Sequence, residues 1–432
     1  MRFALISLGL SVIAVLGSLY ASPGTAGTSQ APIVARIDDF SPWTVAVDES
    51  RNRAYVGQKR AQISIVDLST NEIIGNETVS AHRHRSIALD PFRGRVYIGT
   101  DTREVLMLDA DTGELFKTFE VGPFDPVIAV DDESGFAYFA GSPGLEVRDS
   151  AGDLQADETS MDYKALALDT LRGRAFLIGQ SGTVEDRLVA VKVNEELTIS
   201  HIGSEPIARV AVNEQSGRVY VAGGGSFTAL RGATGAFIAE SAPFPDSAQG
   251  MVIDSATGCV YVATDSLLSG LGPAEARVHV FSADAQLLAT WQLGEGQPKA
   301  IDVNPETGRL VVVDSGRAQI VVLETFDRPD LCEAHGQQAI WGDHDCSGSS
   351  DPVDSLLTLR HDAGLSAATG DCPPLGSIVD VSEASPHPWG DVDCGGDVTP
   401  VDSLKILRSD VGLGIQQGAG CPSIGAEIKV VD

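Results

Sequence analysis

The chain has 432 residues, of which 43% are hydrophobic and 21% charged, and this length predicts two globular domains. Acidic residues outnumber basic ones by 60 to 30, which gives a formal net charge of -30. Such a charge argues against a nucleic-acid partner, because phosphates would be repelled, and it suits a soluble extracellular protein that binds calcium.

Residues 1–26 have the pattern of a secretory signal peptide. Arg2 supplies a short positive region, and residues 3–19 are nearly all apolar. Gly24, Thr25 and Ala26 offer small side chains for cleavage, so we expect a secreted or cell-surface chain that begins at Gly27. The apolar stretch is just long enough to span a bilayer, so a retained anchor is the alternative, while no later segment is apolar enough.

Residues 32–326 repeat one pattern in seven copies. In each copy a short apolar strand ends at an Asp or Asn, here called the anchor residue, and an aromatic or apolar residue follows seven positions later. The anchors are Asp48, Asp90, Asp131, Asp169, Asn213, Asp254 and Asn304. The residues seven positions on are Tyr55, Tyr97, Tyr138, Phe176, Tyr220, Tyr261 and Val311. Successive anchors lie 42, 41, 38, 44, 41 and 50 residues apart, and a constant hairpin offset at such a period is typical of propeller blades.

Two further short strands complete each copy, and we therefore predict an all-β, seven-bladed propeller. The seventh copy supplies only three strands, whereas residues 33–37 form an isolated strand before the first copy. Pairing that strand with the last blade would close the ring and cover two exposed sheet edges. We expect the anchors to accept hydrogen bonds from turn amides and the aromatic series to lie in the core.

These copies resemble the YVTN-type β-propeller repeats of bacterial surface proteins. The resemblance rests on Tyr-Val-Gly or Tyr-Val-Ala triplets at Tyr55, Tyr220 and Tyr261, and on turns such as Thr112-Gly113. It implies a binding platform, although some relatives are enzymes, and the fold alone does not decide between these functions.

A propeller ligand is expected on the face built by the loops that enter the innermost strands and those between the second and third strands. The candidates there are Trp43, Arg60, His84, Arg85, Arg103, Asp125, Tyr163, Lys164, Glu205, Gln249, Gln297 and Lys299. The run His82–Arg85 could bind an anion or a metal, or could simply be solvated surface. Neither a nucleophile elbow nor a phosphate loop occurs, so we predict a protein without catalytic activity.

After a linker at residues 327–340, two copies of an acidic loop follow 48 residues apart (391 minus 343). Calcium takes six to eight oxygen ligands, and a twelve-residue loop offers them at positions 1, 3, 5, 7, 9 and 12, with glycine at 6. The predicted ligands of the first loop are Asp343, Asp345, Ser347, the Ser349 carbonyl, Asp351 and Asp354. Those of the second are Asp391, Asp393, the Asp397 carbonyl, Thr399 and Asp402, because Gly395 offers no side chain at position 5.

Each loop is followed by an expected helix, over residues 355–365 and 403–413. We expect the two helices to pack together through Leu356, Leu357, Leu359, Leu404, Ile406 and Leu407.

A loop followed by a helix, with Asp at position 12, resembles the dockerin repeat, and we assign residues 341–426 to a small α-helical, dockerin-like domain. The resemblance implies that calcium shapes the domain and that it docks to a cohesin-like protein. The recognition positions of the family are occupied here by Pro352 and Val353 in the first repeat, and by Pro400 and Val401 in the second.

Six cysteines in an exported chain predict disulfides. Cys346 and Cys394 occupy matching places in the acidic repeat, as do Cys372 and Cys421. We therefore predict the pairs Cys346–Cys372 and Cys394–Cys421, which leaves Cys259–Cys332, although six cysteines allow 15 connectivities.

Together these features predict a secreted, monomeric, noncatalytic binding or scaffolding protein. In this prediction the propeller recognises an unknown ligand and the calcium-loaded module docks to a cohesin-like or surface partner. The alternative is an extracellular propeller enzyme, acting on carbohydrate for instance, that the same module targets.

Overall fold

The structure is a computed structural model that describes residues 28–431 with interruptions. The residues not described are 1–27, 40, 60–61, 81, 160, 181–186, 193–194, 200–206, 224, 233–234, 236, 245, 267–273, 333–336, 346, 348, 366, 368–372, 382–386, 419–420 and 432. The predicted signal peptide, Arg60 and Glu205 therefore lie outside the described residues.

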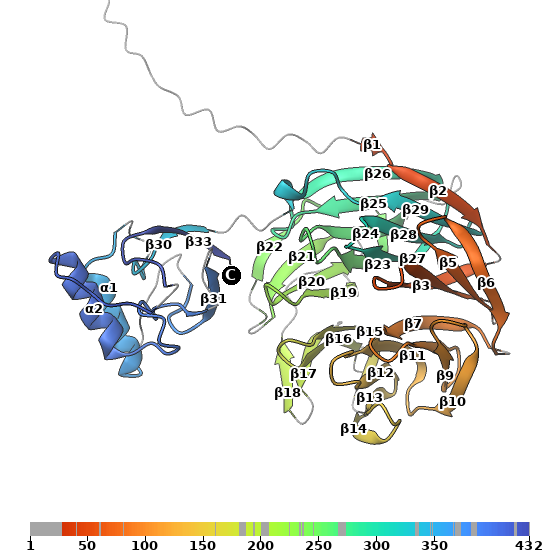
Figure 1. The fold of residues 1–432 in the computed structure, drawn as a ribbon, viewed down its shortest axis with the longest axis horizontal. Helices are drawn as coiled ribbons and strands as arrows, with labels where there is room; N and C mark the ends of the chain where they lie inside the picture. Colours follow the sequence, from red (N-terminus) through yellow and green to blue (C-terminus); the bar gives the residue numbers. More distant parts are fainter. Residues whose placement is uncertain are drawn as a thin grey trace, which may run out of the picture.

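Seven sheets stand around a ring, which confirms the predicted propeller (Figure 1). Blade 1 consists of β3 (Pro42–Asp48), β4 (Arg53–Gln58), β5 (Gln62–Asp67) and β6 (Glu72–Thr78). Blade 2 consists of β7 (His84–Asp90), β8 (Arg95–Thr100), β9 (Glu104–Asp109) and β10 (Leu115–Glu120). Blade 3 consists of β11 (Phe124–Val130), β12 (Ala137–Ser142), β13 (Gly144–Arg148) and β14 (Leu154–Glu158). Blade 4 consists of β15 (Asp162–Asp169), β16 (Arg174–Gln180), β17 (Arg187–Lys192) and β18 (Glu195–Ile199).

The remaining blades complete the ring and carry its seam. Blade 5 consists of β19 (Ile207–Asn213), β20 (Arg218–Gly223), β21 (Phe227–Arg231) and β22 (Phe237–Glu240). Blade 6 consists of β23 (Asp246–Ile253), β24 (Val260–Ser266), β25 (Glu275–Phe281) and β26 (Leu287–Glu295). Blade 7 consists of β27 (Pro298–Asn304), β28 (Arg309–Asp314), β29 (Gln319–Glu324) and the N-terminal strand β2 (Ile33–Asp38).

The ring closes as the sequence predicts. Strand β2 pairs antiparallel with β29, from Ile33 opposite Leu323 to Asp38 opposite Gln319. A shorter strand that was not predicted, β1 (Thr28–Gln30), adds in parallel to the outer edge of blade 6. Main-chain hydrogen bonds between the two ends of the ring therefore join its first and last segments, and they cover edges that would otherwise be exposed.

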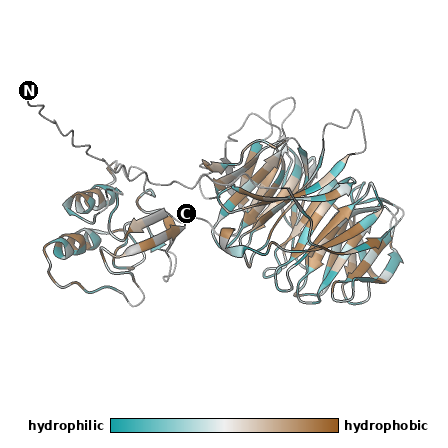
Figure 2. Ribbon diagram, turned by 90° about the horizontal axis from the view of Figure 1, so that it is seen from above, coloured by the Kyte–Doolittle hydropathy of each residue, from teal (hydrophilic) through white to brown (hydrophobic). Residues whose placement is uncertain are grey.

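The repeated residues take the positions that the sequence predicts. Each of the seven anchors accepts a hydrogen bond from a backbone amide two or three residues later; Asp48, for example, accepts from the Arg51 amide at 3.0 Å. The aromatic series is buried in every blade, with Val311 in the place of a ring in blade 7. Figure 2 shows hydrophobic residues along the propeller strands, where neighbouring blades share their cores.

The first strand of every blade carries a β-bulge near its start. In blade 1, Pro42 lies opposite Gln58 and Thr44 opposite Gly57, so the register skips Trp43. The residues skipped in the other blades are Arg85, Asp125 with Pro126, Lys164, Ala208, Gln249 and Lys299. A bulge re-aims a side chain, and here it does so at the same end of each first strand.

The C-terminal unit combines two helices with a small sheet and lies outside the ring (Figure 1). Its sheet has the order β30 (Gln337–Ile340), β33 (Glu427–Val431), β31 (Ile378–Val381) and β32 (His387–Pro388). The sheet therefore includes residues that the sequence assigned to the linker and to the end of the chain. Its core is built around Trp341 and Trp389, which meet edge to face with ring centroids 6.1 Å apart.

The two helices begin earlier than predicted. Helix α1 spans Pro352–Asp362 and α2 spans Pro400–Asp410, whereas we expected them to begin at residues 355 and 403. Asp351 and Thr399 form the N-caps in capping boxes with Asp354 and Asp402, and a proline occupies the first turn of each helix. The last residue of each acidic loop, Asp354 or Asp402, therefore lies in the first turn of the helix that follows. Among the described residues, neither helix nor any other is long and apolar enough to cross a membrane.

Two predicted disulfides are present. Cys259 beside β24 is bonded to Cys332, and Cys394 in the second acidic loop is bonded to Cys421. The predicted pair Cys346–Cys372 lies outside the described residues.

Candidate metal centre

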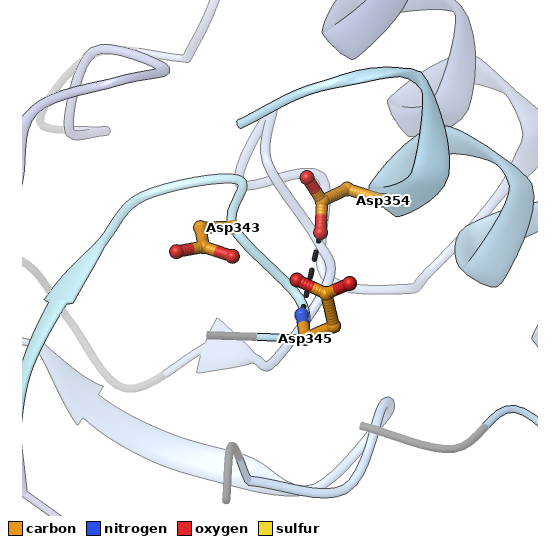
Figure 3. A group of neighbouring side chains, drawn as sticks. All are labelled: Asp343, Asp345 and Asp354. Carbon is orange, nitrogen blue, oxygen red and sulfur yellow. Dashed lines mark hydrogen bonds between the residues drawn. The ribbon is translucent and has the colours of Figure 1, made fainter. Parts of the chain in front are cut away.

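The first acidic loop gathers three carboxylates. Asp343, Asp345 and Asp354 each place an oxygen within 4.8 Å of the others, and Figure 3 shows the three side chains converging below the start of α1. Asp354 Oδ1 accepts hydrogen bonds from the backbone amides of His344 at 2.6 Å and Asp345 at 3.3 Å. The Ser347 amide donates to one oxygen each of Asp343 and Asp345, both at 3.0 Å. Backbone amides therefore hold all three carboxylates in place.

The second loop repeats this arrangement. Asp391, Asp393 and Asp402 also lie within 4.8 Å of one another. The Gly395 amide, at the position of Ser347, donates to Asp391 at 2.8 Å and to Asp393 at 3.0 Å. Asp402 Oδ1 accepts from the Asp393 amide at 3.1 Å, as Asp354 accepts from Asp345. The two loops are therefore copies in geometry as well as in sequence.

A lysine and a histidine beside the carboxylates distinguish the second loop. Lys405 Nζ lies 2.6 Å from Asp393 Oδ2, and His387 Nδ1 lies 3.7 Å from Asp391 Oδ2. The residue at the position of Lys405 in the first repeat is Leu357. A cation entering the second loop must therefore compete with a lysine ammonium group that the first loop lacks at this position.

The chemistry of these side chains fits a hard divalent cation. Burial, together with the nearby Asp345 and Asp343 carboxylates, raises the pKa of Asp354 to about 6. Burial also raises the pKa of Asp391 and of Asp402. Close, buried carboxylates repel one another, and an ion coordinated by their oxygens would offset that repulsion. Oxygen donors without sulfur or imidazole favour calcium or magnesium over zinc.

The structure places five of the six predicted ligands of the first loop close together, and Asp351 is the exception. Besides the three acids, Ser347 lies beside Asp343, with Oγ 3.5 Å from Asp343 Oδ1 and 3.5 Å from the Ser349 carbonyl. Asp351 uses its carboxylate to cap α1, where it accepts from the Val353 amide at 2.7 Å. In a loaded loop, Asp351 would act through water, as position 9 often does.

In the second loop, Thr399 is likewise engaged at the helix start. Its Oγ1 donates to Asp402 Oδ2 at 2.9 Å and accepts from the Val401 amide at 3.2 Å. Asp397 lies on the exposed side of the loop, and its predicted ligand is its backbone carbonyl.

The two repeats face each other about an approximate two-fold axis. Ser355 and Ser403 are equivalent residues, and their hydroxyls lie 2.7 Å apart where α1 meets α2. Trp341 and Trp389 are likewise equivalent and in contact. Contacts between identical positions are the mark of an isologous arrangement.

This symmetry overturns the predicted packing of the helices. Ile406 is buried and Leu357 partly buried, but Leu356, Leu359, Leu404 and Leu407 are exposed. Small serines occupy the contact instead, so the leucines remain outside. The exposed apolar residues form equivalent pairs, here called the paired apolar face: Val353 with Val401, Leu356 with Leu404, and Leu359 with Leu407.

Sequence reasoning included Val353 and Val401 as recognition residues but treated the leucines as core. A signal was available, because Val353, Leu356 and Leu359 are spaced three apart along one side of a helix and recur in both repeats. Leu356 and Leu404 are both 56% exposed, and Val353 and Val401 both 51% exposed, so the two helices offer the same surface.

Comparisons with known proteins support the propeller. No protein-family model matches this sequence, and the search of curated proteins gave no match. Among solved structures, the chain is similar to the β-propeller domain of Myceliophteria thermophila Cps50 (Swd1), with a TM-score of 0.57 and 11% sequence identity. The similarity covers 68% of this chain and 100% of that domain. At this identity it shows the fold alone: this chain contains a seven-bladed β-propeller.

Proposed function

We propose that this protein is a secreted, noncatalytic binding protein. Its propeller is the recognition platform, and its C-terminal unit is a dockerin-like module that carries two calcium ions and docks to a cohesin-like protein partner. The two disulfides among the described residues support an extracellular location, where such bonds form and persist.

Calcium is the ion that best suits both the loops and this location. In the first loop Asp343, Asp345 and Asp354 would hold it, with Ser347 and the Ser349 carbonyl beside them. In the second loop Asp391, Asp393 and Asp402 would do so, with the Asp397 carbonyl and Thr399. Extracellular calcium fills sites with dissociation constants as weak as about 10⁻⁴ to 10⁻³ M, so even a weakened second loop would be loaded.

The paired apolar face is the observation that carries the docking proposal. Exposed leucines and valines are common singly on protein surfaces, but a set repeated at equivalent positions of two packed helices indicates an interaction site. The amides of Val353 and Val401 donate to the N-cap side chains two residues before them, so an ion that orders each loop also orders the face beside it. Binding to the partner should therefore depend on calcium.

The test measures capture of a cohesin-like module by the full-length chain. Leu356→Asp with Leu404→Asp should weaken capture at least about thirtyfold, because a charge placed in an apolar contact removes a binding hot spot. Chelation of calcium should weaken capture of the unmodified chain to a similar extent.

The control is Leu154→Asp, which adds the same charge at an exposed leucine of β14 in the propeller. It should leave capture unchanged. Capture that survives both the chelator and the double substitution would disprove docking through this face.

A further inference from the structure

The bulges of the first strands gather polar and aromatic side chains at one end of the ring. First strands of neighbouring blades contact one another around the centre of the propeller, including β27 with β3 and β3 with β7. Three adjacent blades thus place their skipped residues, Lys299, Trp43 and Arg85, side by side. Each bulge changes the direction of the side chain that has no partner in the strand register.

A cavity of about 410 Å³ opens between blades 1 and 2 at this place. It is lined by Ser41, Trp43, Lys59, Arg83, His84 and Arg85. Its volume lies within the range of small-molecule sites, about 300–1,000 Å³. The loops that build it are those that enter the innermost strands and those between second and third strands, as expected for a ligand-binding face.

Two lysine ammonium groups lie close to the tryptophan ring of this cavity. Lys59 Nζ lies 4.1 Å from the centroid of the Trp43 ring, and Lys299 Nζ lies 5.7 Å from the same ring. Burial, followed by the charges of Lys299, Arg83 and Arg85, lowers the pKa of Lys59. Four positive side chains therefore meet in a chain whose net charge is -30. We name Trp43, Lys59, Arg83, Arg85 and Lys299 the mouth cluster.

Acidic neighbours balance only part of this charge. Arg85 Nε lies 2.9 Å from Asp125, Lys299 Nζ lies 3.8 Å from Asp265, and Arg83 Nε lies 3.9 Å from Asp101. Among the described residues, the ammonium group of Lys59 contacts the ring of Trp43. Burial lowers the pKa of His84 to about 4, so this histidine is neutral near pH 7 and the positive charge comes from lysine and arginine alone.

We propose that the mouth cluster binds the oxyanion groups, carboxylate or sulfate, of a small acidic ligand. Lysine and arginine donate charge-assisted hydrogen bonds to such groups, and the indole of Trp43 offers an apolar face beside them. The partly buried site strengthens these contacts relative to bulk water. This inference rests on the proposal that the propeller is the recognition platform, and it assigns that platform a chemical class of ligand.

Trp43 gives the protein its own reporter. Of the four tryptophans, Trp291, Trp341 and Trp389 are buried, whereas Trp43 is partly exposed. Iodide should quench the fluorescence of Trp43 more efficiently than caesium at equal, low ionic strength, despite the negative charge of the protein. In the variant Lys59→Ala with Lys299→Ala, this preference for iodide should fall at least about twofold. The control Lys117→Ala, in the outer strand β10, should retain it.

Ligand protection then tests binding itself. Sulfate, citrate and trigalacturonate should each shield Trp43 from iodide, and the double variant should need at least about tenfold more of each. A lower concentration of trigalacturonate than of sulfate would assign the site to an acidic saccharide, whereas equal concentrations would assign it to small oxyanions. Neutral galactotriose should give no protection.

Three results would overturn the inference. Caesium could quench Trp43 as efficiently as iodide, no anion could protect Trp43, or the double variant could bind the anions as tightly as the native chain does. The measurements are made in calcium and repeated in chelator. Loss of protection only in chelator would implicate the C-terminal unit, whereas failure in both conditions would refute the mouth cluster and leave the docking proposal untouched.

Discussion

The propeller and the C-terminal unit bury acidic side chains in different ways. In the propeller, buried acids have partners within the chain: Asp246 accepts two hydrogen bonds at 2.7 Å from Arg277, and Asp48 accepts from Arg51 and its own turn. In the C-terminal unit, backbone amides hold two groups of three acids close together, and Lys405 pairs with one of the six, Asp393. The blades of the ring stabilise one another, whereas our proposal is that a bound ion stabilises the small unit with its crowded carboxylates.

Removal of calcium gives the largest expected contrast between the two regions. At free calcium about a hundredfold above the dissociation constant, each site stabilises the folded unit by about 2.7 kcal/mol. Chelator should therefore lower the C-terminal transition in differential scanning calorimetry and leave the propeller transition in place. Asp343→Asn with Asp391→Asn should abolish the response to chelator. A propeller transition that fell equally would contradict this separation.

The two disulfides should likewise act on different transitions. Cys394 and Cys421 close a loop of 27 residues, so Cys394→Ser with Cys421→Ser should destabilise the C-terminal unit by about 3.5 kcal/mol. The matched pair Cys259→Ser with Cys332→Ser should shift the propeller transition instead, since Cys259 lies in blade 6 and both sulfurs belong to the propeller core. Differential scanning calorimetry of both variants tests this prediction. If both pairs of substitutions shifted the same transition, the prediction would be refuted.

The stability of the propeller should depend on pH through a contact between blades 7 and 1. Asp302 in blade 7 accepts a hydrogen bond of 2.7 Å from the Val47 amide in blade 1, and burial raises its pKa to about 7. A carboxyl group whose pKa is higher in the folded than in the unfolded chain costs stability as pH rises from about 4 to about 7. Asp302→Asn should therefore gain about 4 kcal/mol relative to the native chain between pH 4 and pH 8.

Urea unfolding at the two pH values measures this change. Glu240→Gln, at an exposed position of β22, serves as the control and should show no such gain. An Asp302→Asn variant that tracks the native chain at both pH values would show that this carboxyl group is not protonated in the fold.

The smallest expected effect separates the two acidic loops. Lys405→Leu makes the second loop like the first, where Leu357 stands, and removes the ammonium group 2.6 Å from Asp393. Calcium should then bind the second loop about three- to tenfold more tightly, because a partly exposed ion pair opposes binding by about 1 kcal/mol. Arg408→Leu removes a charge from the same helix without contact to the loop and should change nothing. Calcium titration in an Asp343→Asn background resolves the second site, and unchanged affinity in Lys405→Leu would show that the lysine does not compete.

Local chemistry made the blades predictable from the sequence. An anchor such as Asp48 fixes a turn through its own side chain, and Tyr55 then opens the next strand at a constant offset. Strand β2 could also be predicted, because the seventh repeat lacked one strand. The acids of both loops were predictable for the same reason: their spacing encodes the geometry of one short segment.

Features that depend on distant contacts were missed. The sheet of β30, β33 and β31 pairs segments roughly 50 to 90 residues apart that are too short to show a strand period. The helical leucines looked like a core, since a periodic pattern does not say which side another helix covers. In the structure, Ser355 and Ser403 lie where the two helices meet, so the serine side of each helix is covered and the leucine side is exposed. Lys59 was missed because only the folded ring places it over Trp43.

Ion binding by the full-length chain is the most direct test of the account. Trp341 and Trp389 each precede an acidic loop by two residues, so they should sensitise the luminescence of terbium bound there. We predict two terbium ions per chain, both displaced by calcium, and one ion after Asp343→Asn. A chain that binds no ion, or whose signal calcium does not displace, would contradict the proposal that metal shapes the docking unit.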